Sequence, residues 1–256
     1  MNRAVVVGMA SFALLAAAPP ALEPVPEPGP GVVEESVRRQ LSAAHRAVRE
    51  LSALGGEPAA PAAAYGELGR LYAAYELWDA ARPCFANAAA LAAGPADRGT
   101  WHHFLGYVLE RRGDLAAARR HYREALAANP RDRAAALRGA ELDLALGRPA
   151  DAERSFGRLA AAPGFEAAAR FGLGRLDARR GDLAGAIAHF RRVLELQPGA
   201  TRVRYALAQA YRRSGRAEEA RRQIAALGTA GSEGPVRFPD PLIGSLGVAA
   251  RGGAFH

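Results

Sequence analysis

The sequence has no lysine and a single cysteine among its 256 residues. All 34 of its basic side chains are therefore arginines. Without lysine there can be no Walker A phosphate loop, no Schiff-base amine and no Ser-Lys nucleophile pair. The lone thiol, Cys84, excludes an intramolecular disulfide and a zinc site built from cysteines. These absences remove several classes of enzyme and metalloprotein.

Aromatic residues are also scarce, at 7% of the chain, whereas half of the residues are apolar. The core must therefore be built from small aliphatic side chains, chiefly alanine and leucine. Such a composition, with few β-branched runs, favours closely packed helices over sheets. We expect an all-α protein. The length allows one large domain, two small domains or an elongated array.

The formal net charge is +8 at neutral pH. This charge is typical either of a polyanion binder, for nucleic acid or an acidic membrane surface, or of a general bias that replaces lysine with arginine. The arginines are spread along the chain, and no basic stripe interleaved with aromatics is present. Dispersed charge gives only weak, non-specific attraction. We expect no nucleic-acid partner, and nothing indicates peripheral membrane association.

Residues 1–21 have the layout of a secretory signal peptide. A short positive start, Met1-Asn2-Arg3, is followed by an apolar run over residues 4–18 and then by small residues and prolines. The run is shorter than the roughly 20 residues that span a bilayer comfortably. We expect cleavage around residues 17–21 and a periplasmic or secreted location. A buried N-terminal helix and an uncleaved anchor are the alternatives.

Two segments precede the main pattern of the chain. Residues 22–31 are rich in proline, which predicts an extended, semi-rigid linker without a face that packs. Residues 32–56 are predicted to be helical, because apolar residues such as Val37, Leu41 and Val48 recur at spacings of three and four. We expect this helix to cap the N-terminal end of the domain that follows.

An internal repeat of 34 residues organises the chain from residue 62. Its clearest marker is a glycine at a predicted helix–helix turn, at Gly113, Gly147, Gly181 and Gly215. Five residues after each glycine stands an alanine, and four further on a bulky apolar residue: Ala118 and Tyr122, Ala152 and Phe156, Ala186 and Phe190, Ala220 and Ile224. Glycine permits the positive φ of a short connection. One helix pair cannot bury both of its faces, so we expect the pairs to stack.

These residues resemble the tetratricopeptide repeat (TPR) family, whose pattern is W-x₂-L-G-x₂-Y…A-x₃-F…P. The best matches are Tyr65-x₂-Leu68-Gly69-x₂-Tyr72, Leu105-Gly106, Leu173-Gly174 and Ala118-x₃-Tyr122-x₂-Ala125-x₄-Pro130. The resemblance covers residues 62–228 and departs from the pattern at Gly139-Ala140 and Asp177. It implies an α-solenoid, a right-handed superhelix of about five helix–turn–helix repeats with the N-terminal capping helix. The expected repeats are residues 62–95, 99–132, 133–166, 167–200 and 201–228.

Small residues recur where the first helix of each pair must come close to the second. They are Gly69, Gly106, Ala140, Gly174 and Ala208, and we expect Ala81, Ala118, Ala152, Ala186 and Ala220 to face them. A bulky side chain at either place would hold the backbones apart, at a cost of roughly 1–3 kcal/mol.

The tail, residues 229–256, changes to a composition rich in glycine and proline. Residues 242–250 are predicted either to form a short C-terminal cap over the open edge of the fifth repeat or to remain disordered, as the stub of a longer array would.

The sequence carries no signal of catalysis. It has no G-x-S-x-G elbow, no H-E-x-x-H helix and no C-x-x-C-H haem site. The adjacent His102 and His103 point about 100° apart on a helix, so they do not converge on one metal. Cys84 is interpreted as a small core thiol, because no base is spaced to serve it. We expect a protein that is not an enzyme, with no cofactor and no metal.

The resemblance implies that a partner binds the concave groove lined by the first helices. Carrying over the family's groove positions gives a set of candidate residues: Tyr107, Arg111, Phe171, Arg175, Arg179, Arg202, Tyr205, Gln209 and Arg212. Arginine forks bind carboxylates bidentately, and aromatic rings anchor apolar groups. We expect a peptide segment with acidic and apolar residues. The alternative is that these arginines only keep the protein soluble.

The leading hypothesis is a non-catalytic scaffold for protein–protein interaction in the cell envelope, with other proteins as its partners. A second hypothesis is a substrate-recruiting or assembly subunit of an envelope enzyme or export complex. A third is a cytosolic polyanion binder. The sequence does not indicate the oligomeric state or the identity of the partner.

Overall fold

The computed structural model describes residues 20–27, 29, 34–54, 57–227 and 235–247. Regular structure in these ranges is α-helical, in the order α1 (Glu35–Ala53), α2 (Ala59–Ala74), α3 (Trp78–Leu91), α4 (Pro95–Arg111), α5 (Leu115–Ala128), α6 (Arg133–Ala145), α7 (Pro149–Leu159), α8 (Glu166–Arg180), α9 (Leu183–Leu196), α10 (Thr201–Arg213), α11 (Ala217–Ala225) and α12 (Pro241–Gly244). The predicted signal peptide falls almost wholly outside these ranges. None of the helices described here combines the length and apolarity of a membrane span.

Local sequence explains where the helices begin and end. Asp114, Asp132 and Asp182 each accept a hydrogen bond from the backbone N–H three residues later, which caps α5, α6 and α9. The four predicted turn glycines have φ between 73° and 87°: Gly113, Gly147, Gly181 and Gly215. A side chain is strained at such φ values, so glycine marks the turn inside each of these hairpins.

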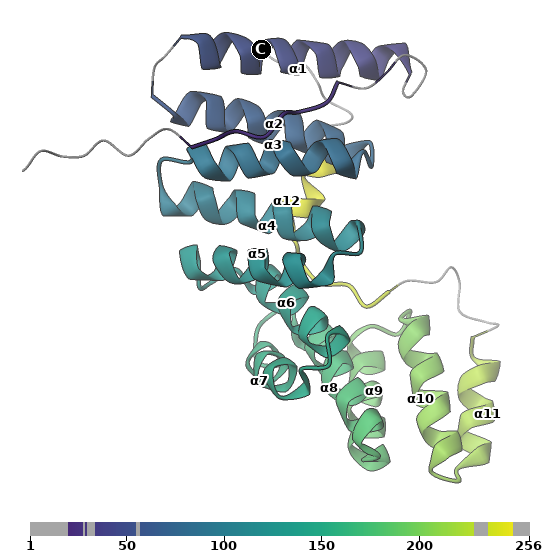
Figure 1. The fold of residues 1–256 in the computed structure, drawn as a ribbon. Helices are drawn as coiled ribbons and strands as arrows, with labels where there is room; N and C mark the ends of the chain where they lie inside the picture. Colours follow the sequence, from purple (N-terminus) through teal and green to yellow (C-terminus); the bar gives the residue numbers. More distant parts are fainter. Residues whose placement is uncertain (1–19, 28, 30–33, 55–56, 228–234, 248–256) are drawn as a thin grey trace, which may run out of the picture.

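The helices pack as five hairpins, α2–α3, α4–α5, α6–α7, α8–α9 and α10–α11, which stack in chain order (Figure 1). Each second helix also packs on the first helix of the next hairpin. Helix α1 lies on α2 at the N-terminal end, where it buries Val37, Leu41 and Val48. The predicted all-α solenoid of five repeats with an N-terminal capping helix is therefore confirmed.

Glycines do let the two helices of a hairpin approach closely, but the side chains that face them on the second helix are aromatic rings rather than the predicted alanines. A Cβ placed on Gly69 would lie 2.8 Å from the ring of Phe85, and one on Gly106 would lie 2.8 Å from the ring of Tyr122. The predicted partner alanines, such as Ala81, are fully buried. In the first, second and fourth hairpins, the ring four residues after the alanine fills the space that the glycine leaves.

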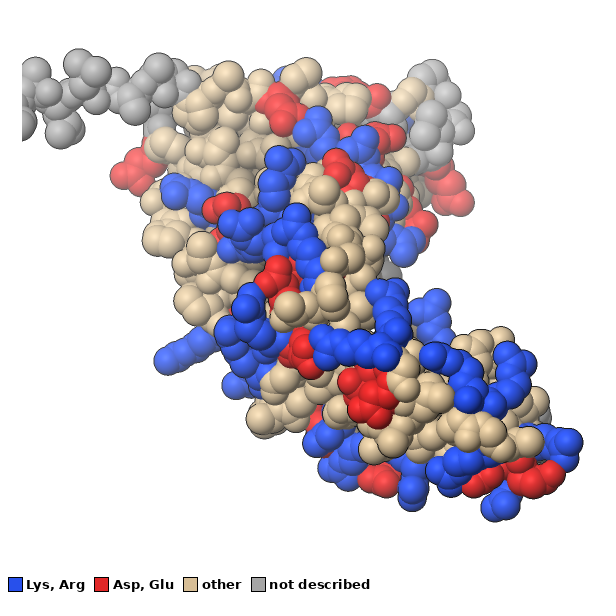
Figure 2. Space-filling view, turned by 60° about the horizontal axis from the view of Figure 1, so that its bottom comes forward, with Lys and Arg blue, Asp and Glu red and all other residues tan. Residues whose placement is uncertain are grey.

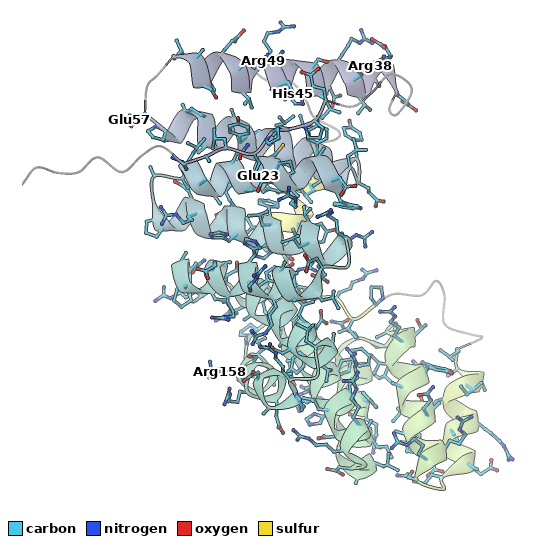
Figure 3. All side chains as sticks on the ribbon, viewed as in Figure 1. Glu23, Arg38, His45, Arg49, Glu57 and Arg158 are labelled. Carbon is cyan, nitrogen blue, oxygen red and sulfur yellow. The ribbon has the colours of Figure 1, made fainter. Side chains whose placement is uncertain are left out.

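The segment at residues 20–27 is bound to the solenoid, whereas the sequence predicted a linker without a packing face. The side-chain amide of Asn87, on α3, makes both hydrogen bonds that the backbone of Glu23 offers, at 2.7 and 2.8 Å. The Tyr72 hydroxyl donates to the carbonyl of Pro26 at 2.8 Å. Figure 3 shows Glu23 on this extended segment in front of α3. Prolines prevent the segment from joining a helix, so polar side chains hold it instead.

The C-terminal segment also lies elsewhere than predicted. A short helix does form, α12, but it contacts α4 rather than the fifth hairpin. Residues 235–240 run back from the α10–α11 end across the angle between the two halves of the solenoid (Figure 1). The tail therefore covers part of the inner face, which we define as the surface formed by the first helices of the hairpins, α2, α4, α6, α8 and α10.

Candidate peptide-binding face

The nine residues predicted to line a groove come from three of the first helices, and their contacts divide them into two groups. Tyr107 and Arg111 lie on α4. The others lie on α8 and α10 and form what we call the arginine face: Phe171, Arg175, Arg179, Arg202, Tyr205, Gln209 and Arg212. The structure thus does not bring all nine into one site.

Tyr107 and Arg111 take part in a stack of side chains beside α3. The Tyr107 ring meets the Trp78 ring edge-on, with centroids 5.8 Å apart. The guanidinium of Arg111 lies 5.3 Å from the Trp78 centroid, and that of Arg138 lies 5.1 Å from the Tyr107 centroid. At these distances a guanidinium cation is attracted to the face of the aromatic ring. Both predicted residues are therefore already engaged by neighbouring side chains.

The arginine face is more open. The guanidinium of Arg175 lies 5.7 Å from the centroid of Phe171 on the preceding turn of α8. Arg179 donates one hydrogen bond to the carbonyl of Leu144, at the end of α6, which fixes its side chain across two repeats. Tyr205 is 54% exposed. A shallow hollow of about 200 Å³ lies between α8 and α10 and is lined by Arg175, Ala178, Arg179, Phe190, Ala206, Gln209, Ala210 and Arg213.

Positive charge on this face is only weakly compensated. Burial lowers the pKa of Arg175, and the charges of Arg179 and Arg202 lower it further, against the opposing effect of Glu141. Within the described ranges, no carboxylate lies within 4 Å of Arg175, Arg202 or Arg212. Figure 2 shows arginines crowding the lower half of the molecule, with fewer acidic groups between them. A bound carboxylate would relieve this repulsion.

A second set of polar residues, which we call the buried acid–base cluster, lies where the tail meets α4 and α6. His103 is fully buried, and its Nδ1 lies 2.8 Å from Asp132 while its Nε2 lies 3.3 Å from Asp240. The Nε of Arg138 donates to Asp240 at 2.8 Å, and its Nη1 lies 3.3 Å from Glu110. Two cations therefore face three carboxylates, and His103 and Asp240 are the most deeply buried of the five side chains.

The protonation of His103 follows from these neighbours. Burial alone would lower its pKa, but the hydrogen bonds and charges of Asp132 and Asp240 outweigh burial and raise the pKa to about 9. Burial would likewise raise the pKa of Asp240, but His103 and Arg138 lower it below its usual range. His103 is thus a cation and Asp240 an anion at neutral pH.

This cluster has no periodic pattern in the sequence from which it could be predicted. Arg138 is one of 34 arginines, and the Pro-Asp-Pro stretch around Asp240 gives no periodic signal. The one available signal was His103, a histidine within the first helix of a predicted repeat. His102, its neighbour, instead faces His121 across the α4–α5 hairpin, with the two Nδ1 atoms 3.1 Å apart. Burial lowers the pKa of both of these histidines, that of His121 to about 4.

No group of three or more His, Cys, Asp or Glu side chains converges on a metal-binding arrangement in the part of the chain that the structure describes. A hollow of about 570 Å³ is lined by residues of α5, α6, α7 and the turns that follow α5 and α7. Four arginines line it: Arg119, Arg123, Arg133 and Arg158. Arg119 is already paired with Asp143 at its edge.

The thiol of Cys84 is expected to be inert in the folded protein. Its sulfur is buried and donates to the Ala80 carbonyl at 3.2 Å, and burial raises the pKa of the thiol. The thiolate is the reactive form, so alkylation by N-ethylmaleimide should proceed only as the protein unfolds. Mass spectrometry after timed labelling, with and without denaturant, measures this. A Ser42→Cys variant, exposed on α1, should gain one label at once. Labelling of Cys84 at that same rate would contradict the prediction.

The geometry defines the class of protein as a helical-repeat solenoid with an open inner face. Sequence models of the tetratricopeptide repeat match residues 100–132, 137–201 and 177–233. Together these matches span about half of the chain. The protein belongs to the tetratricopeptide repeat family.

Solved structures agree with this assignment. The structure of YrrB, described as a TPR protein with an unusual peptide-binding site, aligns over 82% of this chain and 98% of its own, with a TM-score of 0.58 and 21% identity. A tetratricopeptide repeat protein from Parabacteroides merdae aligns over 83% and 84% of the two chains, with a TM-score of 0.60 and 17% identity. MamA aligns over 64% and 88%, with a TM-score of 0.56 and 17% identity. Identities this low show the fold. No curated protein sequence matches the chain.

Proposed function

We propose that this protein is a non-catalytic scaffold whose arginine face binds a partner segment that carries acidic and apolar residues. The observation that supports this is a set of arginines on α8 and α10, Arg175, Arg202 and Arg212, with no carboxylate within 4 Å among the described residues, on the same face as Phe171 and the exposed ring of Tyr205. A carboxylate placed there gains charge-assisted hydrogen bonds, and an apolar residue gains a ring to pack on.

The arrangement of the face favours a protein segment over a polyanion. Arg175 is half-buried against Phe171, and Arg179 is fixed by the Leu144 carbonyl, so their positions are set before a ligand arrives. Preorganised donors lose little entropy on binding and select geometry. A polyanion needs only a dense, mobile positive surface. The peptide-binding description of YrrB, a protein with the same fold, is consistent with this choice.

We place the scaffold in the cell envelope. The support is the order of residues 1–21: a positive start, an apolar run and a zone of small residues and prolines. N-terminal sequencing of the protein purified from its native cells tests this directly. A mature chain that begins around residues 18–22 supports export. An unprocessed Met1 in a cytosolic fraction contradicts it and favours a cytosolic role.

Charge reversal on the arginine face is the test of binding. A triple variant with Arg175→Glu, Arg179→Glu and Arg212→Glu should recover at least tenfold less partner than the wild type in a crosslinked pull-down from envelope extract. Each lost charge-assisted hydrogen bond is worth about 1.5–3 kcal/mol, so three losses suffice for this effect. The identity of the recovered protein also distinguishes a general scaffold from a substrate-recruiting subunit. Recovery of one enzyme in stoichiometric amount would indicate the recruiting subunit.

The matched control makes the same change of charge on the second helices. Arg120→Glu, Arg191→Glu and Arg222→Glu alter exposed positions on α5, α9 and α11. This control should recover as much partner as the wild type. Equal loss in both triple variants would show that net charge matters rather than the arginine face, and unchanged recovery in both would refute the proposal.

A further inference from the structure

The inner face is not empty along its whole length, because residues 235–247 of the same chain lie on its middle part. The Phe238 ring packs against Phe165, with centroids 6.1 Å apart, and the guanidinium of Arg138 lies 5.4 Å from the Phe238 centroid. Val236 packs against the cores of the third and fourth hairpins, and Leu246 is 6% exposed beside the first two.

Asp240, at the centre of this segment, makes its most specific contacts with the solenoid. The side chain of Asp240 is only 8% exposed, and its two oxygens lie beside different cations, Arg138 at 2.8 Å and His103 at 3.3 Å. The same carboxylate accepts a hydrogen bond from the N–H of Ile243, which caps α12. A neutral side chain at this position would take one of two carboxylate partners from each cation, leaving His103 with Asp132 and Arg138 with Glu110, so the site favours a carboxylate.

The backbone of the segment is held in a way that does not depend on its side chains. The amide of Gln197, at the end of α9, donates to the carbonyl of Arg237 at 2.8 Å and accepts from its N–H at 2.9 Å. One carboxamide can make both bonds only to an extended residue. The prolines on either side of Asp240 favour that extended form.

The same mode of binding recurs at the other end of the molecule. There Asn87 makes both backbone hydrogen bonds to Glu23, and Arg82 pairs with the Glu23 carboxylate at 2.6 Å. Here the residue bound through its backbone, Glu23, is itself the acidic residue and is followed by proline, whereas in the tail Gln197 binds the backbone of Arg237 and the acidic residue, Asp240, follows three positions later. Both sites therefore combine a carboxamide that binds an extended backbone with an arginine that pairs with a carboxylate next to proline.

The tail does not fill its site completely. A hollow of about 470 Å³ remains between the tail and the start of α4 and α6, lined in part by Thr100, Asn129, Pro239 and Leu242. Among residues 235–247, Leu246 is the one buried apolar residue. A segment with larger side chains would bury more apolar surface in the same place.

We propose that the inner face of α4 and α6, together with Gln197, is a recognition site for an extended segment with the order aromatic–Pro–Asp–Pro–aliphatic, which residues 235–247 occupy until a partner protein carrying that order replaces them. The inference rests on the proposed scaffold function but uses none of the residues of the arginine face. Because the tail is tethered, it competes at an effective concentration in the millimolar range. A partner must therefore bind tightly or be present at high local concentration.

Fluorescence anisotropy of a labelled peptide with the sequence of residues 235–247 tests the proposal on the full chain. Asp240→Ala weakens the resident tail but leaves the site intact, so this variant should bind the peptide at least tenfold more tightly than the wild type. A peptide with alanine in place of the aspartate should bind neither protein. Adding Gln197→Ala to the variant should weaken peptide binding several-fold, because the backbone clamp is lost.

A second variant separates this proposal from the proposed function. Arg175→Glu with Arg179→Glu, placed in the Asp240→Ala background, should leave the affinity for the peptide within about twofold, whatever its effect on partner recovery. Equal peptide affinity of the wild type and the folded Asp240→Ala variant would overturn the proposal. A wild-type protein that is a dimer, together with an Asp240→Ala variant that is a monomer, would also overturn the proposal, because the tail would then bind the site of a second copy.

Displacement can also be followed without any variant. Hydrogen exchange of residues 235–247 in ¹⁵N-labelled wild-type protein should speed up when unlabelled peptide is added at millimolar concentration, since the peptide replaces the tail. The alanine peptide serves as the control. Unchanged protection at saturating peptide would show that the tail is a fixed part of the fold and would refute exchange.

Discussion

Replacing Gly172 with alanine is expected to destabilise the protein by about 1–3 kcal/mol, although alanine is the better helix former. Gly172 lies in the middle of α8, and a Cβ there would stand 2.4–2.6 Å from three atoms of the Phe156 ring. That ring is fully buried between hairpins three and four, so it cannot swing into solvent. The clash must be relieved by moving α7 away from α8, which loosens the contact between two repeats.

The same substitution at Gly139 is the matched control and should act in the opposite direction. Gly139 also lies inside a first helix, α6, but nothing stands within 4 Å of the Cβ it would gain. Gly139→Ala should therefore stabilise the protein by roughly 0.5–1 kcal/mol, because alanine loses less backbone entropy on folding. Each of the two variants adds one methyl group inside a first helix, at positions 33 residues apart.

Urea unfolding followed by circular dichroism measures both changes. The transition midpoint of Gly172→Ala should fall, and that of Gly139→Ala should rise, with similar slopes. Adding Phe156→Leu to Gly172→Ala should recover part of the loss, because leucine occupies less of the space next to the new methyl group. A loss of stability in both alanine variants would show that the packing between α7 and α8 is not the cause.

The solenoid could be predicted from the sequence because the residues that determine the packing of each hairpin lie close together within one repeat. The turn glycines have to adopt a positive φ, and they recur every 34 residues, so they could be recognised without any tertiary information. The aromatic residues nine positions later, such as Tyr122 and Phe190, could be placed in the core for the same reason. What the pattern did not show was that these rings, rather than the alanines, fill the space above Gly106 and Gly174.

The two docked segments could not be predicted, because nothing periodic links them to their binding sites. Asn87 and Glu23 are 64 residues apart, and Arg138 and Asp240 are 102 apart. Proline-rich stretches have no amphipathic face, and their contacts are made by isolated side chains, polar ones such as Asp240 and apolar ones such as Val25 and Phe238. One signal was present in Asn87, an amide at a position within an alanine-rich helix that proves to be 1% exposed. A buried amide needs partners, which here are supplied by a distant extended backbone.

The candidate site was predicted in part. Phe171, Arg175, Arg179 and their neighbours on α10 lie on first helices, as the family pattern implies. Tyr107 was placed on the correct helix, but its ring is covered by Arg138, which belongs to the next repeat. Contacts between neighbouring repeats decide which groove positions remain open, and a pattern within one repeat does not contain them.

The second large effect concerns pH: the tail is expected to leave α4 as the pH is raised through about 9. With the tail docked, His103 is held between Asp132 and Asp240, and its pKa is about 9. When the tail is undocked, the imidazole keeps Asp132 but loses both Asp240, which raises its pKa, and the burial that the tail provides, which lowers it. We expect the loss of the Asp240 carboxylate to be the larger effect, so that the undocked pKa is lower. A group whose pKa is raised by docking stabilises the docked state fully below its undocked pKa, and that contribution is lost as the pH rises through the docked value.

The charges around His103 set the size of the effect. The groups that face it or its partners are Asp132 before α6, Asp240 on the tail, Tyr122 on α5, and the pair of Arg138 and Glu110. Once His103 is neutral, three carboxylates face Arg138 alone. Each pKa unit that Asp240 supplies corresponds to a factor of ten in the docking equilibrium, so docking should weaken roughly tenfold or more between pH 7 and pH 10.

Methyl NMR follows the tail directly, because the methyl groups of Ile243 and Leu246 pack against the first hairpins when docked and their signals do not exchange with solvent. The intensities of the docked and undocked methyl signals at pH 7, 8, 9 and 10 give the populations of the two states and hence the docking equilibrium. In an Asp240→Asn variant docking should be weaker at pH 7 and nearly independent of pH in this range, because His103 no longer gains a carboxylate on docking. If the wild-type and Asp240→Asn signals changed in parallel, some other group would control the tail. If neither changed up to pH 10, apolar contacts alone would hold it, and the salt bridges of Asp240 would contribute little to docking.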